Sequence, residues 1–271
     1  MIHPAKNLQK INEFANKKLG QNFLTSNAAL NFLEEIITNK DNVLEIGPGF
    51  GAVTEILQNL TKNLVLIDTD HNMIDFMVND FGFAKDKIIH RDFLKVEKSQ
   101  LEKFSINTIC GNLPFNISTP IIEKVILEYP AVDTIIVGLQ LEYAKRCTMK
   151  KGNSWSIFLQ AAGSVSFIKK ISKKAFFPEP GVDSAWIVWR RDAKVENLSH
   201  LTTFLRCSFW AKRKNLYNNL RKNPYIDNFA DREKWLELCE TLKNDLQKNR
   251  ADALTIDEIL KFYKLFLPFL K

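Results

Sequence analysis

The chain has 271 residues, of which 45% are hydrophobic and 25% charged, and its formal net charge at pH 7 is +7. These proportions are ordinary for a globular protein and exclude collagen-like, low-complexity and disordered chains. No apolar run approaches the roughly 20 residues that span a bilayer, and the basic N-terminal segment lacks the apolar stretch of a secretory signal. Four widely spaced cysteines are typical of a reducing compartment, and no histidine pairs with a cysteine at metal-ligand spacing. We therefore expect a cytoplasmic protein with no membrane segment and no metal.

Strand-like runs alternate with helical ones in the first half of the chain. The expected strands cover 43–46, 63–68, 87–90, 107–110 and 133–139, and the expected helices cover 27–39, 52–60 and 71–80. This alternation favours βαβ units and a mostly parallel sheet. Two further strand-like runs, at 165–171 and 184–190, have no helix between them. They are expected to form an antiparallel edge of the same sheet.

The pattern changes after Arg191. Segments 199–222, 231–247 and 256–267 are helix-like, and the polar stretch 192–199 is typical of a linker. We therefore predict an α/β domain at 1–194 and a small all-helical domain at 195–271.

A glycine loop follows the first strand of this pattern. The segment V-L-E-I-G-P-G-F-G (43–51) reads as a strand, a tight turn and a helix start, and Asp68 follows at the end of the next strand. Nucleotide-binding α/β domains place there the acid that holds the ribose hydroxyls. The G-x-G-x-G spacing and the preceding Glu45 argue against a pyrophosphate and favour the cationic S-adenosylmethionine. Asp92 is a candidate acceptor for a hydrogen bond from the adenine amine. A structural role as a helix N-cap explains its position equally well.

The segment G-N-L-P-F (111–115) follows a predicted strand, at the sheet edge where ligands bind. An adenine N6 amine is a poor nucleophile because its lone pair is delocalised into the ring. Hydrogen bonds from this amine to the Asn112 side-chain oxygen and the Leu113 carbonyl would favour a pyramidal nitrogen aimed at a methyl donor. Pro114 would fix the turn, and Phe115 would stack on the base.

Positive charge is concentrated in two stretches. Eight basic residues and no acid lie between Glu142 and Glu179, and six basic residues and no acid lie from Arg206 to Lys222. A solvated surface would explain one such stretch. Two of them in one chain favour nucleic acid as the partner.

Several motifs together resemble those of the rRNA adenine N6,N6-dimethyltransferases, most closely the bacterial small-subunit (16S) type. They are K-K-L-G-Q-N-F-L (17–24), E-I-G-P-G-F-G (45–51), G-N-L-P-F-N-I-S-T-P (111–120), F-F-P-E-P-G-V-D-S-A (176–185), K-R-K-N-L-Y-N-N-L (212–220) and N-R-A-D-A-L-T-I-D-E (249–258). The resemblance implies a Rossmann-like class I S-adenosylmethionine methyltransferase domain with a small C-terminal helical domain. It also implies a monomer that acts on 16S rRNA in the small ribosomal subunit.

The resemblance implies a role for particular residues. The implied cofactor-binding residues are Asn22, Leu24, Gly47, Gly49, Asp68, Asp92 and Asn112. The implied catalytic residues are Asn112, Leu113, Pro114 and Phe115. The target base is expected between Phe115 and Phe176, although Phe176 could equally be a core residue. The rRNA-contacting residues are expected to be Lys212, Arg213, Lys214, Arg221 and Lys222.

Five positions depart from the usual pattern of the family. Phe115 stands where Tyr is commoner, Asp68 replaces Glu, Arg91 replaces Gly, Lys212 replaces Arg, and Gly181 replaces a basic residue. None of them removes a group that the predicted chemistry requires. They bear on the rate and the substrate pose rather than on the class of reaction.

Three other functions compete with the 16S enzyme. A 23S rRNA adenine methylase of the resistance type shares the glycine loop and the catalytic segment, but the motifs at 212–220 and 249–258 favour the small-subunit enzyme. A non-catalytic ribosome-assembly factor would have no need of an intact N-L-P-F segment. A nicotinamide-dependent dehydrogenase is disfavoured by the glycine spacing and by Glu45.

Overall fold

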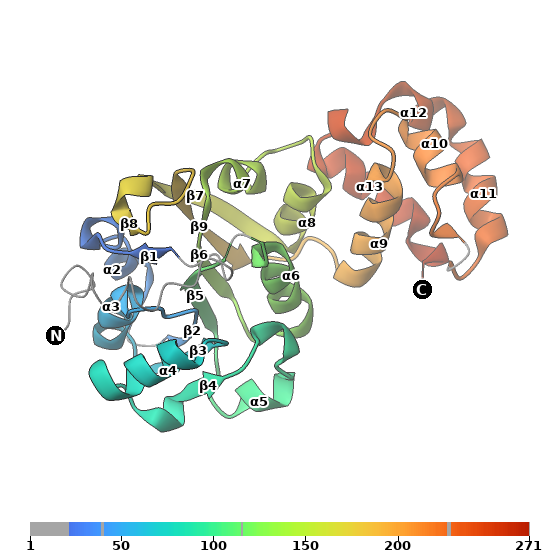
Figure 1. The fold of residues 1–271 in the computed structure, drawn as a ribbon. Coiled ribbons are helices and arrows are strands. Elements are labelled where there is room, and N and C mark those ends of the chain that lie inside the picture. The colour runs from blue at the N-terminus through green and yellow to red at the C-terminus, as the bar shows by residue number, and fades with distance from the viewer. Residues whose placement is uncertain (1–21, 39–40, 115, 227–228, 271) are drawn as a thin grey trace. The chain divides into compact units, whose positions relative to one another are not determined.

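The computed structural model describes residues 22–38, 41–114, 116–226 and 229–270, except for the side chain of Asn27 (Figure 1). The described chain forms two compact units. One unit contains the described residues up to Ala144 together with Ser166–Arg190, and the other contains Lys145–Val165 and Arg191–Lys271. The two units are thus interleaved in the sequence. A single boundary between residues 194 and 195 stays a prediction.

A seven-stranded sheet forms the centre of the first unit. Its strands, in spatial order, are β4 (Ile88–His90), β3 (Asn63–Asp68), β2 (Asn42–Ile46), β5 (Thr108–Asn112), β6 (Thr134–Gln140), β9 (Ser184–Arg191) and β7 (Gly163–Ile171). The first five are parallel, and β9 pairs antiparallel with β6. The predicted Rossmann-like α/β class, with an antiparallel strand toward one edge, is confirmed.

The apolar runs of β2, β3 and β6 are buried on both faces, as parallel strands covered by helices should be. The α-helices of this part are α2 (Leu33–Ile36), α3 (Ala52–Leu60), α4 (His71–Asp75), α5 (Lys98–Glu102), α6 (Ser118–Glu128) and the first half of α7 (Leu141–Cys147), whose residues from Lys145 on belong to the second unit. A π-helical turn (Phe76–Asp80) continues α4, and 3-10 turns cover Asn27–Ala29, Lys85–Lys87, Phe93–Lys95 and Lys173–Ala175.

The helix predicted over 27–39 is wrong in length. Only Leu33–Ile36 is α-helical, although the apolar spacing does bury Leu30 and Leu33 completely. Ile37 is extended, and the Asp41 carboxylate accepts the backbone N–H and the hydroxyl of Thr38 at 2.7 and 3.0 Å. This side-chain bonding competes with further helical turns and ends the helix early.

The strand order places three loops at one edge of the sheet. The chain runs from β2 to β3 on one side and later returns to β5 on the other side of β2. The loops after the carboxyl ends of β2, β3 and β5 therefore meet where the order reverses, which is the position at which parallel sheets bind ligands. The short strand β1 (Phe23–Leu24) pairs antiparallel with β8 (Phe176–Phe177) and brings the first described residues to this edge.

The second unit is helical, as predicted for the C-terminal part. Its α-helices are α8 (Ser154–Ala162), α9 (Leu198–Phe209), α10 (Leu216–Arg221), α11 (Arg232–Thr241), α12 (Lys243–Lys248) and α13 (Ile256–Phe266), with 3-10 turns at Ala251–Ala253 and Leu267–Phe269. Buried aromatic rings form its core, and the ring centroids of Trp235 and Phe266 lie 4.5 Å apart. None of the helices in the described residues is long and apolar enough to cross a membrane.

Candidate cofactor and catalytic site

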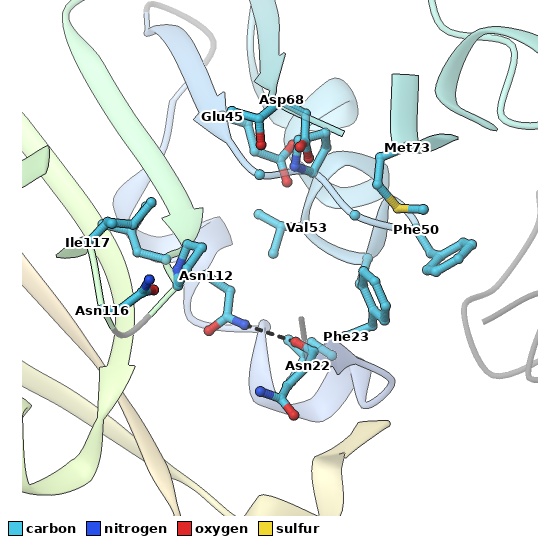
Figure 2. A pocket seen from close by; sticks show the side chains of 18 residues that line it. Asn22, Phe23, Glu45, Phe50, Val53, Asp68, Met73, Asn112, Asn116 and Ile117 are labelled. Carbon is cyan, nitrogen blue, oxygen red and sulfur yellow. Dashed lines mark hydrogen bonds between the residues drawn. The ribbon is translucent and has the colours of Figure 1, made fainter. Parts of the chain in front are cut away.

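A pocket of about 210 Å³ lies at the carboxyl ends of β2, β3 and β5 (Figure 2). It brings together most of the residues that the sequence predicts for cofactor binding and catalysis. These are Asn22, Leu24, Gly47, Gly49, Asp68, Asn112, Leu113 and Pro114. Asn22 and Asn112, which are 90 residues apart in the sequence, thus converge on one cavity because of the strand order.

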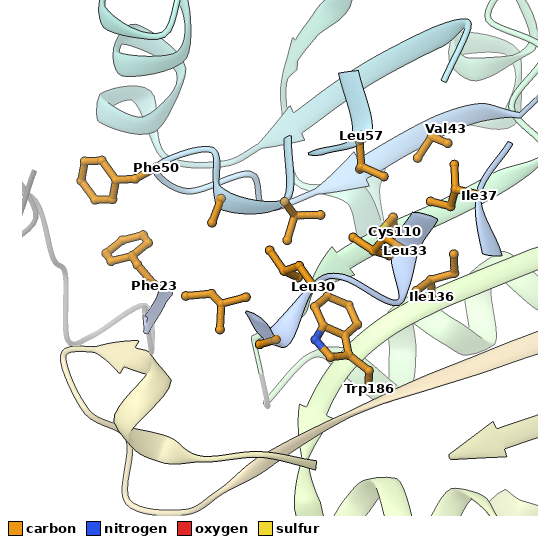
Figure 3. Close-up of a cluster of buried hydrophobic side chains, with 14 of the residues drawn as sticks. Phe23, Leu30, Leu33, Ile37, Val43, Phe50, Leu57, Cys110, Ile136 and Trp186 are labelled. Carbon is orange, nitrogen blue, oxygen red and sulfur yellow. The ribbon is translucent and has the colours of Figure 1, made fainter. Parts of the chain in front are cut away.

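The glycine loop turns tightly beneath the aromatic side chain of Phe23. Gly49 has a φ of +53°, and a Cβ atom at this position would lie 2.8 Å from the Phe23 ring. Only glycine combines this backbone conformation with so close an approach. Phe23 in turn packs edge-to-face on Phe50 at 4.6 Å, within the buried cluster of Figure 3. The loop, β1 and the core of the unit therefore support one another.

Two carboxylates line the pocket. Glu45 is 1% exposed, and its Oε2 accepts a hydrogen bond of 2.7 Å from the Thr54 hydroxyl. Burial raises the pKa of Glu45 to about 8, against the lowering effect of Thr54, and the nearby charge of Asp68 raises it further. Burial also raises the pKa of Asp68 to about 6. Both groups would be stabilised in their ionised forms by a cationic or hydrogen-bond-donating ligand.

We expect the free energy of unfolding of the ligand-free protein to fall between pH 7 and 8.5 through the titration of Glu45. Its pKa is about 8 when folded and ordinarily 4.5. At pH values between these two pKa values the folded protein binds more protons than the unfolded chain, so the free energy of unfolding falls as the pH rises. From pH 7 to 8.5 the expected fall is about 1 kcal/mol. In Glu45→Gln, which retains an oxygen for Thr54 but cannot ionise, this part of the decrease should disappear from urea-unfolding curves. Replacing the exposed Gln58 by Ala, which removes no ionisable group, is the control and should leave the pH dependence unchanged.

Asn112, at the end of β5, is held by two neighbouring elements. Its Nδ2 donates a hydrogen bond of 3.3 Å to the backbone carbonyl of Asn22, as Figure 2 shows. Because a backbone carbonyl can only accept a hydrogen bond, the Nδ2 of Asn112 and not its Oδ1 faces Asn22. The Asn112 Oδ1 is buried and has no hydrogen-bond partner in the described structure. An acceptor without a partner at this place suits a ligand that brings an N–H donor.

Gly138 on β6 supports the same segment and was not predicted from the sequence. It pairs with Asn112 across the strands, and its carbonyl accepts the N–H of Leu113 at 3.3 Å. A Cβ atom at position 138 would lie 2.5 Å from the Asn112 Oδ1. The present position of the amide oxygen therefore depends on the absence of a side chain at residue 138.

Two of the residues predicted for the cofactor and the target base, Asp92 and Phe176, are not among the residues that line this pocket. The Asp92 carboxylate accepts the N–H of Leu94 at 2.9 Å and caps a 3-10 turn, which is the alternative role considered for it. Phe176 is 4% exposed and belongs to the hydrophobic core. Phe115 lies outside the described residues. Roles for these three residues in ligand binding stay predictions.

Arg91 and Gly181 depart from the family pattern, and their surroundings show what each change affects. Arg91 donates its backbone N–H to the carbonyl of Asp68 at 2.9 Å, a contact that any residue except proline could make. A Cβ atom at Gly181 would meet no atom within 4 Å. Neither departure disturbs the pocket.

The pocket also has walls that the motifs alone did not indicate. They come from residues beside the predicted ones and from the helices after β2 and β3, and include Phe23, Phe50, Val53, Thr69 and Met73. Phe23 and Phe50 lie inside quoted motifs, so adjacency could have indicated them. Met73 could be placed only with the packing of α4 against the sheet.

The predicted rRNA-contacting residues all lie in the second unit. Lys212 and Lys214 are exposed and line a separate pocket of about 480 Å³. Arg213 and Lys222 are also exposed but do not line it. The Arg221 Nε donates to the Glu240 carboxylate at 2.8 Å. Within the described residues, no group of three or more His, Cys, Asp or Glu side chains could hold a metal ion.

The sequence profile of the ribosomal RNA adenine dimethylases matches residues 12–261 of this chain. The chain belongs to this family. A relative from Malacoplasma penetrans, named ribosomal RNA small subunit methyltransferase A, is 36% identical over 222 residues, 79% of this chain and 80% of the relative. A relative of the same name from Chlorobium phaeobacteroides is 30% identical over 260 residues, 93% of this chain and 91% of the relative.

Solved structures agree on the fold. A dimethyladenosine transferase from Plasmodium falciparum superimposes with a TM-score of 0.72 at 23% identity, over 88% of this chain and 94% of that one. A 23S rRNA methyltransferase gives 0.60 at 23% identity, over 82% and 100%. Family membership confirms the predicted resemblance. The protein is an S-adenosylmethionine-dependent rRNA adenine dimethyltransferase rather than a nicotinamide-dependent dehydrogenase.

Proposed function

We propose that the protein methylates the N6 atoms of two adjacent adenosines near the 3′ end of 16S rRNA, during maturation of the small ribosomal subunit. The observation that carries the chemistry is the buried Oδ1 of Asn112, a residue that lines the pocket, which has no hydrogen-bond partner among the described residues. The choice of the small subunit is supported by the names of the relatives that are 30–36% identical. It is also supported by the family motifs at 212–220 and 249–258.

The pocket fits S-adenosylmethionine by the chemistry of its lining. This group supplies an electrophilic methyl carried on a sulfonium. The Glu45 and Asp68 carboxylates suit its amine, sulfonium and ribose hydroxyls, and the glycine loop leaves room for close backbone contact. Apolar side chains, among them Phe50 and Val53, complete the walls.

The residues of the N-L-P-F segment would act on the nitrogen that accepts the methyl group. The Asn112 Oδ1 and the Leu113 carbonyl would each accept one N6 hydrogen bond, which localises the lone pair of the amine. The Asn22 carbonyl and the Gly138 carbonyl hold these two residues in place. Preorganised acceptors of this kind lower the barrier because they need no rearrangement during the reaction.

The remaining expectations complete the proposal. The protein is expected to work as a cytoplasmic monomer that binds rRNA through the exposed basic side chains of its second unit. Lys212, Arg213, Lys214 and Lys222 are all exposed there. Arg221 would contribute less charge than the others because it is paired with Glu240.

Methyl transfer to small subunits that lack the 3′-end dimethyladenosines tests the proposal directly. Labelled S-adenosylmethionine, nuclease mapping and mass spectrometry should place the label on two adjacent adenosines as N6,N6-dimethyladenosine. Large subunits from the same cells serve as the control and should remain unlabelled. Label on 23S rRNA would instead identify an enzyme of the resistance type. Cofactor binding without transfer to either RNA would favour an assembly factor.

A further inference from the structure

An exposed tryptophan marks the end of α9 in the second unit. Trp210 is 39% exposed, whereas Trp186 and Trp235 are fully buried. Its Nε1 donates a hydrogen bond of 3.1 Å to the backbone carbonyl of Asn219 on α10. Asn219 is itself 2% exposed and donates its side-chain amide to the Ser208 carbonyl at 2.6 Å. The hydrogen bond from Nε1 thus holds one edge of the indole against the buried Asn219, while part of the ring remains exposed to solvent.

A basic side chain lies over this ring, and others line the pocket beside it. The Nζ of Lys214 lies 5.0 Å from the centroid of the Trp210 ring, within the range of a cation–π contact. Lys214 also lines the pocket of about 480 Å³, together with Lys212 and Arg146. Ser154, Ser208 and Asn219 supply polar groups to the same lining, and Asp252 is the one carboxylate among the described residues that form it. The exposed ring therefore adjoins a basic, polar cavity.

This combination has the features of a single-stranded nucleic-acid site. Proteins bind unpaired nucleotides by pairing a cationic groove for phosphates with aromatic side chains on which bases stack. In duplex RNA the bases are paired and stacked on one another, so no base face is free to stack on the indole. The charge of the 206–222 stretch, which contains no acid, complements a polyanion.

We propose that Trp210 and the adjoining pocket bind one unpaired nucleotide of the rRNA. The base stacks on the Trp210 ring, and Arg146, Lys212 and Lys214 hold the flanking phosphates. This inference rests on the proposed rRNA substrate and adds a second contact to it, made within the second unit. It assigns Trp210 a role in substrate affinity that the charge pattern alone does not indicate.

Equilibrium binding of the full-length variants to three labelled RNAs tests this site. The probes are a transcript of the 3′-terminal domain of 16S rRNA, a 12-nucleotide oligoadenylate and a 12-base-pair duplex. Trp210→Ala should weaken binding to the transcript and the oligoadenylate by about 5- to 150-fold and leave duplex binding unchanged. Trp210→Phe, which retains a stacking ring, should restore most of the affinity. The matched control is Leu265→Ala, which removes an apolar side chain of similar exposure (44%) from α13.

The salt dependence separates stacking from charge. Lys212→Ala should reduce the slope of log K against log salt by about 0.7 for the single strand, since one phosphate contact is lost. Trp210→Ala should leave this slope unchanged. Equal affinities of Trp210→Ala and wild type for all three RNAs, or an equal loss on duplex and single strand, would overturn the proposal. Failure of the wild type to methylate small subunits would count against the proposed function instead, because it does not depend on Trp210.

Discussion

Replacing Asn112 by alanine is expected to reduce methyl transfer by at least about 10²- to 10³-fold, the usual cost of losing one preorganised polar group from an active site. The substitution removes the Oδ1 acceptor and leaves the target amine with only the Leu113 carbonyl. Binding of the cofactor should be largely retained, because the glycine loop, Glu45 and Asp68 are untouched. Single-turnover transfer and calorimetric binding of S-adenosylmethionine measure the two effects separately.

Two further variants make this expectation specific. Asn112→Asp keeps an acceptor of similar size but loses the N–H that binds the Asn22 carbonyl and sets a negative charge against that carbonyl. It should therefore also be slow, although an acceptor is present. The control is Asn59→Ala, which removes an exposed amide from α3, outside the pocket. Wild-type turnover in Asn112→Ala would contradict a role of the amide in the reaction.

The sheet and most of the pocket could be predicted from the sequence because their signals are local. Apolar runs predicted the parallel strands, and their alternation with helices implied that the strand ends meet at one edge. Asp68 ends one predicted strand and Asn112 lies in the segment that directly follows another, which is why both could be placed at that edge. The glycine loop could also be predicted, because Gly49 and Gly51 have positive φ values, which glycine adopts more readily than other residues.

The other features depend on contacts between distant segments. Nothing near Gly138 in the sequence indicates that the Asn112 amide lies against it, because that contact arises from strand register. The pairing of Arg221 with Glu240 joins α10 to α11 and cannot be seen in the charge of the 206–222 stretch alone. Likewise, the cavity beside Trp210 joins residues 146–154 to residues 208–219 and 251–252. Charge density indicated this region, but only packing shows which side chains share a cavity.

Gly111 directly precedes Asn112, and Gly111→Ala is expected to destabilise the protein. Residues 43–45 of β2 pair with residues 108–110 of β5, so the next residue of β5 lies directly beside the end of β2. A Cβ atom at position 111 would lie 2.3 Å from the backbone carbonyl oxygen of Ile46. Because the obstacle is backbone rather than a flexible side chain, the strands themselves must separate. We expect a loss of about 1–3 kcal/mol in the free energy of unfolding, measured in urea.

The same displacement should weaken cofactor binding, because the two strand ends carry the pocket. Gly47 follows Ile46 directly and donates its N–H to the Ile67 carbonyl at 2.9 Å, so a shift of β2 would move the glycine loop. Gly181→Ala is the matched control. A Cβ atom there meets nothing within 4 Å, so the reduced entropy of the unfolded chain should leave stability unchanged or up to about 1 kcal/mol higher. If Gly111→Ala instead unfolded at the wild-type urea concentration and bound S-adenosylmethionine normally, β2 and β5 could separate freely. The close approach of these strands would then not be what fixes the position of the N-L-P-F segment relative to the glycine loop.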